Sequence, residues 1–202
     1  MSKKEGENFS KRYNLKWVIG ISLWTFFLAI IISILTENLV KSLNILIAFL
    51  ILLSIILIGI IFDIIGISVT IADEKPFHAM AANKISEAKV AIKLVRNAGP
   101  VSNFCNDVIG DISGIISGSV GATIIYKLLN TYGFKNGTLL SILLTALTAS
   151  FTVGGKAIGK SIAFYNYEKI IFQVAKFFNF LEVNFHLDFF PNKKKNNKQS
   201  KE

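Results

Sequence analysis

The sequence contains little cysteine, histidine and charge. Cys105 is the single cysteine among 202 residues, and His78 and His186 are the two histidines. One cysteine cannot form an intramolecular disulfide or a zinc knuckle, and two distant histidines leave little material for a histidine-rich metal site. Charged residues make up 17% of the chain, whereas soluble domains carry about 25%. The shortage of charged residues is matched by an excess of apolar ones.

Hydrophobic residues make up 52% of the chain and gather in long runs. No Asp, Glu, Lys or Arg interrupts residues 17–36, 42–62 or 136–155. A helix needs roughly 20 apolar residues to cross the hydrocarbon layer, and each run is about that long. The first run is longer than the core of a cleaved signal, about 7–15 residues, so we expect a retained anchor. The sequence therefore predicts an integral membrane protein.

We expect an all-α, polytopic membrane protein with about four transmembrane helices. The expected spans are residues 17–36, 43–63, 102–128 and 138–155. A basic amphipathic helix from Pro76 to Asn97 is predicted to be a cytoplasmic juxtamembrane helix, ended by Ala98-Gly99-Pro100. After a glycine-rich break at Gly154–Lys160, an aromatic-rich stretch, Phe164 to Phe190, is predicted to be an interfacial belt helix.

The expected organisation has four parts. They are a basic cytoplasmic N-terminus (1–16), a transmembrane hairpin (17–63), a membrane domain (64–190) and a disordered basic tail (191–202). With both termini inside, only Lys41, Lys127 and Lys135 of the 22 Lys and Arg lie outside, as the positive-inside rule requires. The net charge of +9 then indicates anionic lipid headgroups rather than nucleic acid as the partner. We expect a multi-pass protein of the plasma membrane.

The third expected span carries a polar face. At about 100° per residue, seven residues fall within one sector: Asn103, Asp107, Gly110, Asp111, Gly114, Gly118 and Gly121. The residues expected to face lipid lie opposite: Val108, Ile109, Ile112, Ile115, Ile116 and Val120. Glycines at four-residue spacing let another helix approach closely, and carboxylates at this depth need water, a proton, a partner or a cation.

Two interpretations of this face remain open. The glycines serve helix packing and the aspartates lie near a headgroup boundary, or the face forms an oxygen-lined cation site. The candidate ligands are Asp107, Asp111, Asn103 and Asn106, complemented by Asp63, Ser68 and Thr70 of the second span. Hard divalent cations such as Mg²⁺ take such oxygen ligands.

Lys156 lies at the end of the fourth span, in Gly155-Lys156-Ala157-Ile158-Gly159-Lys160. One interpretation is a boundary lysine whose ammonium reaches the membrane surface. In the other, its ammonium pairs with Asp107 or Asp111 and occupies the place of a metal cation.

At these residues the chain resembles the membrane domain of the CNNM/CorB family of magnesium and cobalt transporters, from about Asp63 to Phe180. The segment Ala88–Asn97 resembles the family's cytoplasmic helical pair, and Ile109-Gly110-Asp111-Ile112 its Ile-Gly-Asn-Thr-like element. Gly155–Lys160 stands in place of a Gly-Glu-x-x-Pro-Lys element, and Tyr167-Glu168-Lys169 resembles the next helix start.

The resemblance implies a homodimeric, sodium-coupled Mg²⁺ exporter with Ser68, Asp111 and Lys156 near the ion. The family's Glu, Pro and Asn are Lys156, Gly159 and Asp111 here, and its nucleotide-binding CBS pair is not in this sequence. Exchange of the ligand Glu for Lys removes one carboxylate and Asp111 supplies one, so the number of carboxylates is kept, but the exchange can destroy the metal site.

The leading hypothesis is a divalent-cation transporter, or a degenerate relative of one, without enzymatic activity or a resident cofactor and with Mg²⁺ as the transported ion. The alternative is a non-transporting scaffold or regulator in which Lys156 fills the ion position. An intramembrane aspartyl protease is a weak third reading of Phe62-Asp63 and Gly110-Asp111, because Val108 replaces the first glycine of the expected Gly-x-Gly-Asp element.

Overall fold

The computed structural model describes residues 15–133 and 136–185, and all regular structure within these ranges is helical. Its helices are α2 (Leu15–Ser42), α3 (Ile45–Ile71), α4 (Lys75–Ala82), α5 (Ser86–Arg96), α6 (Ala98–Asn103), η1 (Phe104–Gly110), α7 (Asp111–Tyr132) and α8 (Gly137–Phe185). Most of the expected N-terminal segment and all of the tail 191–202 lie outside the described residues.

Four stretches are long and apolar enough to cross a membrane: Val18–Val40, Ile45–Ile71, Ala98–Thr131 and Gly137–Asn184. This finding confirms the all-α class and the four expected membrane-crossing helices. Each stretch extends beyond its expected limits, which were 17–36, 43–63, 102–128 and 138–155. The juxtamembrane and belt positions of the remaining helices stay predictions.

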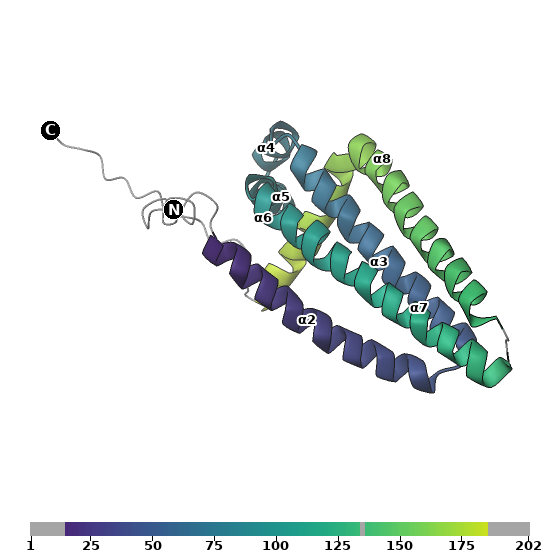
Figure 1. Ribbon diagram of the computed structural model, residues 1–202. Helices are drawn as coiled ribbons and strands as arrows, with labels where there is room; N and C mark the ends of the chain where they lie inside the picture. The colour runs from purple at the N-terminus through teal and green to yellow at the C-terminus, as the bar shows by residue number, and fades with distance from the viewer. Residues whose placement is uncertain (1–14, 134–135, 186–202) are drawn as a thin grey trace, which may run out of the picture.

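Helix α3 lies in the middle of the bundle, between α7 on one side and the first part of α8 on the other (Figure 1). Its apolar residues join those of α2, η1 and α7 in one core. The buried members of this core are Val40, Ala48, Leu52, Ile56, Val108, Ile112, Ile116, Val120 and Ile124. The faces of α3 that contact no other helix are apolar as well, including the exposed Leu46, Leu50 and Ile61, so its sequence is apolar all round rather than on one stripe.

Glycines bring the helices on both sides of α3 into close contact. A Cβ placed on Gly59 of α3 would lie 2.9 Å from Cβ of Ser113 on α7. On the α8 side, a Cβ on Gly159 would lie 2.8 Å from Cγ1 of Ile64, and one on Gly155 would overlap Ile60. Side chains at these positions would force the helices apart, so the spacing depends on glycine.

A second core forms at the end of α3, where α4, α5 and the later part of α8 meet. Its buried members are Val69, Phe77, Val90, Ala91, Ile92, Leu94, Ile171 and Ala175. The expected single helix over 76–97 is wrong: α4 and α5 are separated by a turn in which Lys84 has a φ of 63°. The turn lets both short helices lay an apolar face on this core.

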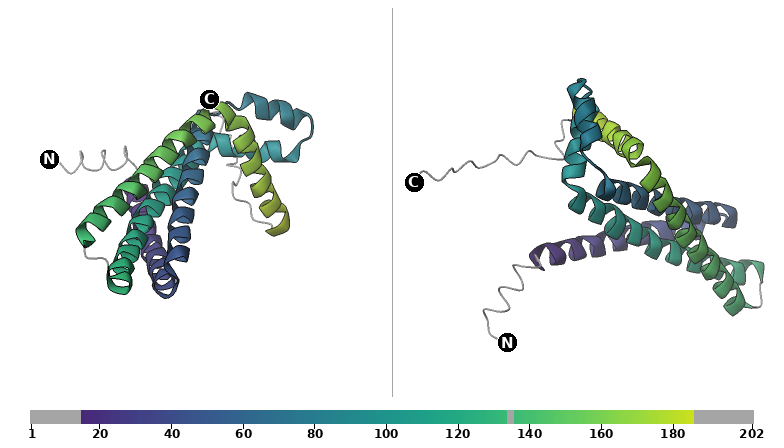
Figure 2. Two further views of the ribbon diagram at one scale, coloured as in Figure 1. Left: turned by 90° about the vertical axis from the view of Figure 1, so that its right-hand side faces the viewer. Right: turned by 90° about the horizontal axis from the view of Figure 1, so that it is seen from above.

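Helix α8 passes unbroken through Gly154–Lys160, so the break expected there is wrong. The chain instead bends at Asn166, whose φ of −129° and ψ of 17° are not helical. Beyond the bend, α8 turns back beside the bundle and meets α5 (Figure 2). An ion pair of 3.7 Å between Lys93 Nζ and Glu182 joins the two helices. The glycines of α8 therefore serve contact with α3 rather than a break.

Lys127 of α7 completes the C-terminal end of α2. Its Nζ donates hydrogen bonds of 2.6 Å to the carbonyl oxygens of Val40 and Leu43. Carbonyls in the last turn of a helix have no partner within that helix, and a cation there also interacts favourably with the helix dipole. Lys127, expected near the outer end of the third span, is half-buried within that helix and fixes the turn between α2 and α3.

The two kinds of glycine in the bundle give a matched stability test. Gly59→Ala should lower the free energy of unfolding by about 1–3 kcal/mol, because its Cβ meets the fixed Cβ of Ser113. Gly118→Ala should leave it unchanged or raise it by up to about 1 kcal/mol, because nothing lies within 4 Å of the added Cβ. Unfolding in detergent micelles measures both. Equal effects of the two substitutions would contradict close α3–α7 contact.

Glu74 links α4 to α5 in a pH-dependent way. Its Oε2 lies 3.1 Å from Nε2 of His78 and accepts a hydrogen bond of 3.0 Å from Nε of Arg96. The hydrogen bond from His78, together with Arg96, lowers the pKa of Glu74 below its usual 4.5. A carboxyl with a lowered folded pKa stabilises the fold above its ordinary pKa and loses that contribution as the pH falls through the folded value.

Glu74→Gln should therefore lower the melting temperature at about pH 6 and have a progressively smaller effect as the pH falls below about 4.5. Thermal unfolding of both proteins from about pH 6 to about pH 3 measures the difference. If the difference in melting temperature between the two proteins does not change with pH, the charge of Glu74 does not stabilise the contact between α4 and α5.

Candidate functional site

The described spans bring one carboxylate and one ammonium together inside the bundle. Nζ of Lys156 on α8 lies 3.4 Å from Oδ1 of Asp63 on α3. Their side chains are 28% and 11% exposed, so the carboxylate is the more deeply buried partner. Oδ2 of Asp63 is buried without a hydrogen-bond partner among the described residues. A charged pair at this depth in a membrane protein is a functional-site candidate because burying it is costly.

The end of η1 lies beside the ammonium. A Cβ on Gly110, the last residue of η1, would lie 3.5 Å from Nζ of Lys156. Helix η1 is a π-helix of 7 residues, in which the hydrogen-bond ladder is widened. Such segments are often found at functional sites. The ion pair thus lies where α3, η1 and α8 meet.

Asn106 of η1 contacts α3 at Gly66, which lies about one helical turn from Asp63. A Cβ on Gly66 would overlap the side-chain amide of Asn106, so the amide rests directly on the α3 backbone. Its Nδ2 donates to Oγ of Ser102 at 3.2 Å, while its Oδ1 is buried without a partner among the described residues. Two buried oxygen atoms with free lone pairs, one on Asp63 and one on Asn106, therefore belong to this region.

A groove between α7 and α8 leads away from the ion pair. It has a volume of about 360 Å³ and is lined by Ile125, Leu144, Val153 and the small or hydroxyl-bearing residues Gly114, Ser117, Gly118, Gly121, Ala122, Ser141, Thr145, Thr148, Ala149 and Thr152. Gly114, Ser117 and Thr152 also line a gap of about 10 Å³ beside Lys156, which is room for about one water. We call the larger space the α7–α8 groove.

The hydroxyl groups of this groove donate to their own helices. Ser117 donates to the carbonyl of Gly114 at 2.8 Å, and Thr152 to that of Thr148 at 2.8 Å. Thr148 donates in the same way to the carbonyl of Leu144 at 2.8 Å. Because their protons are used in this way, the hydroxyl oxygens retain lone pairs that can accept. The α7–α8 groove can therefore bind hydrogen-bond donors or a cation.

The third span is rotated from the sequence expectation. Val108, Ile112, Ile116 and Val120, expected to face lipid, are buried in the core, whereas Ile115 is exposed as expected. Of the residues expected to face inward, Gly110 and Gly121 are buried, but Asp107 and Asp111 are exposed. Gly114 and Gly118 are exposed where they line the α7–α8 groove. The error has a physical reason: lipid and protein core are both apolar, so an apolar stripe on a membrane helix does not indicate which of the two it meets.

The remaining predicted site residues are dispersed. Ser68 is fully buried, and its hydroxyl donates to the carbonyl of Ile64 at 2.7 Å. Thr70 donates similarly to Gly66 at 2.9 Å, and Asn103 is half-buried near the start of η1. Within residues 15–133 and 136–185, no three His, Cys, Asp or Glu side chains come close enough together to hold a metal ion. The expected ligand set is therefore not assembled in this single chain.

The partner of Lys156 differs from both predicted ones. In one of its two interpretations Lys156 pairs with Asp107 or Asp111, whereas the structure pairs it with Asp63. One signal in the sequence indicated the importance of Asp63, which is the only charged residue between positions 42 and 72. Its partner was not evident, because the contact joins residues 93 positions apart on two helices whose relative rotation the sequence does not specify.

Comparison of the chain with known protein families, with curated proteins and with solved structures finds no match. The resemblance to the CNNM/CorB membrane domain therefore rests on the residues quoted above, and it stays an interpretation of them.

The ion pair can be tested with a double-mutant cycle. Lys156→Met should lower the free energy of unfolding by about 3 kcal/mol, because it leaves the Asp63 carboxylate buried without a cation. The combined Asp63→Asn and Lys156→Met variant should be more stable than Lys156→Met alone, because neither charge remains. Unfolding in detergent micelles gives the coupling energy, which we expect to exceed about 1 kcal/mol. Additive effects would contradict a direct interaction.

Proposed function

We propose that this chain is a membrane protein on the plan of a divalent-cation transporter, in which the ammonium of Lys156 occupies the cation position. It then acts as a membrane scaffold or regulator rather than as a transporter. The observation that carries the proposal is the 3.4 Å contact between Lys156 Nζ and the buried carboxylate of Asp63.

The argument is electrostatic. A buried carboxylate needs a compensating positive charge, which a transported cation supplies in a transporter. In this chain the charge is attached to α8 through a side chain, so it neutralises Asp63 without being able to leave. The resemblance to the CNNM/CorB family supports the same view, because Lys156 stands where that family has a Glu. It further implies a homodimer in the plasma membrane with both termini in the cytoplasm.

Transport of Mg²⁺ or Co²⁺ is the second candidate function. It is favoured by Oδ2 of Asp63, which is buried without a partner among the described residues, as the oxygen of an ion site would be. The α7–α8 groove, whose lining includes several hydroxyl-bearing residues, begins beside the pair and offers a route to it. In this case Lys156, whose side chain is 28% exposed, would swing away from Asp63 when the ion enters.

The two functions differ in what divalent cations do to the purified chain. Addition of MgCl₂ or CoCl₂ should leave the melting temperature of the wild type unchanged. Lys156→Glu should be less stable without metal, because two carboxylates then face each other, and it should gain stability as metal is added. Thermal unfolding in detergent micelles across a metal titration measures both effects.

Lys160→Glu is the matched control, because Lys160 lies about one turn further along α8 and is exposed. It should show no metal-dependent stabilisation. Lys156→Met removes the ammonium without adding a carboxylate, so it tests whether metal-dependent stabilisation needs the second carboxylate. If Lys156→Glu gains no stability at any metal concentration, the idea that Lys156 occupies a cation position is wrong.

Flux into proteoliposomes that contain a Mg²⁺-sensitive dye separates the candidates directly. We expect wild-type protein to match protein-free liposomes. Mg²⁺ flux through the wild type that is lost in Asp63→Asn would establish the second candidate instead. Asp111→Ala then tests the exposed aspartate, since equal flux in that variant and the wild type would remove Asp111 from the pathway.

A further inference from the structure

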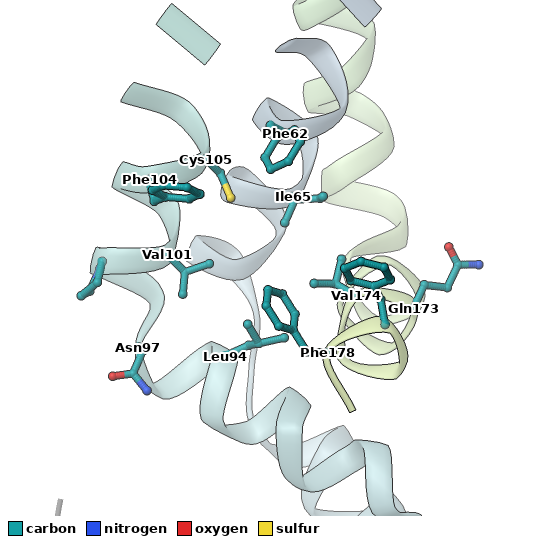
Figure 3. A pocket seen from close by; sticks show the side chains of 12 residues that line it. Phe62, Ile65, Leu94, Asn97, Val101, Phe104, Cys105, Gln173, Val174 and Phe178 are labelled. Atoms are coloured by element: carbon teal, nitrogen blue, oxygen red, sulfur yellow. The ribbon is translucent and has the colours of Figure 1, made fainter. Parts of the chain in front are cut away.

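A second cavity lies apart from the ion pair, at the end of the bundle where the spans meet the short helices. It has a volume of about 840 Å³ and lies between α3, the α5–α6 connection, η1 and the part of α8 beyond its bend (Figure 3). Its wall is almost entirely apolar and includes Phe62, Leu94, Val101 and Val174. This size is within the range of about 300–1,000 Å³ found for small-molecule sites.

The cavity is open on one side rather than closed. Phe104 and Phe177 line it and are 45% and 60% exposed. The two amide side chains of the lining, Asn97 and Gln173, lie at opposite edges and point away from the centre (Figure 3). An apolar interior with polar groups only at its edge favours a hydrocarbon chain over water.

Positive charge lies beside one edge of this cavity. At about 100° per residue, Lys169, Gln173 and Lys176 fall within one narrow sector of α8, and all three are exposed. Glu168 lies about 100° away on the same helix, and Lys176 also has Glu87 of α5 in its surroundings. The edge marked by Gln173 therefore carries two exposed ammonium groups next to an apolar opening.

We propose that this cavity binds one acyl chain of an anionic phospholipid, with the phosphate at Lys169 and Lys176. The lipid comes from the leaflet at the α4–α6 end of the bundle, where an exposed apolar surface and lysines lie side by side as they do on interfacial helices. The acyl chain fills the space that Phe62, Val101 and Val174 enclose. The proposal is independent of the ion pair, because neither Asp63 nor Lys156 lines this cavity.

Native mass spectrometry of the purified full chain tests the proposal. Dioleoyl phosphatidylglycerol is titrated into the protein in micelles, and dioleoyl phosphatidylcholine, with the same acyl chains and no net charge, serves as the lipid control. We expect one tightly retained phosphatidylglycerol per chain and weaker retention of phosphatidylcholine. Equal retention of both lipids would contradict the role given to the lysines.

Two pairs of variants locate the lipid. Val174→Phe fills the cavity and should weaken phosphatidylglycerol binding at least about tenfold. Val183→Phe, at a position 67% exposed on the same helix, is its control and should bind like the wild type. Lys169→Gln and Lys176→Gln should each weaken binding about fivefold, whereas Lys89→Gln, exposed on α5 outside the lining, should not. Binding unchanged by Val174→Phe would overturn the proposal.

Cys105 provides a measurement that needs no substitution. It is the only cysteine of the chain, and its side chain lines the cavity beside Ile65 (Figure 3). Added phosphatidylglycerol should slow alkylation of this thiol by N-ethylmaleimide, and phosphatidylcholine should slow it less. Alkylation at the same rate with and without lipid would show that the cavity is empty or holds another occupant.

Discussion

The arrangement of the bundle depends on one constraint, which is that α3 must contact helices on both sides while it carries a charge. Gly59 brings α7 close, and α8 approaches through Gly155 and Gly159. Within this tight contact the Asp63 side chain is only 11% exposed, and its charge is compensated by the ammonium of Lys156. Because α8 meets α3 along an unbroken helical segment, the position of Lys156 is set by backbone contact. Glycine packing and charge pairing therefore depend on each other.

Much of the fold follows from the sequence, because the length of an apolar run reports directly on whether a helix can cross a membrane. The four membrane-crossing helices were predicted in this way. The rotation of each helix about its axis was not, and most of the apolar residues of the third span that were expected to face lipid lie in the core. In a soluble protein, water would have identified the exposed side, but Ile115 in lipid and Ile116 in the core experience similarly apolar surroundings.

The candidate site was only partly accessible to sequence reasoning for the same reason. Asp63 and Lys156 were each recognisable, since a charge within an apolar run is costly. Their contact depends on two conditions that no local pattern encodes: an unbroken α8 at Gly154–Lys160 and the rotation of α3 about its axis. Asp107 and Asp111 show the opposite case, because a regular spacing placed them on one face but could not say what that face meets.

The bond from Lys127 to the end of α2 has a consequence for biosynthesis. The carbonyl groups it satisfies belong to residues 87 and 84 positions earlier in the chain. A ribosome therefore releases the first two membrane segments well before it has made the lysine that completes their connecting turn. Until the third segment inserts, the carbonyl groups of Val40 and Leu43 lack the lysine. Water or lipid headgroups can donate to them in the meantime. The final geometry of this early hairpin is reached only after translation has passed α7.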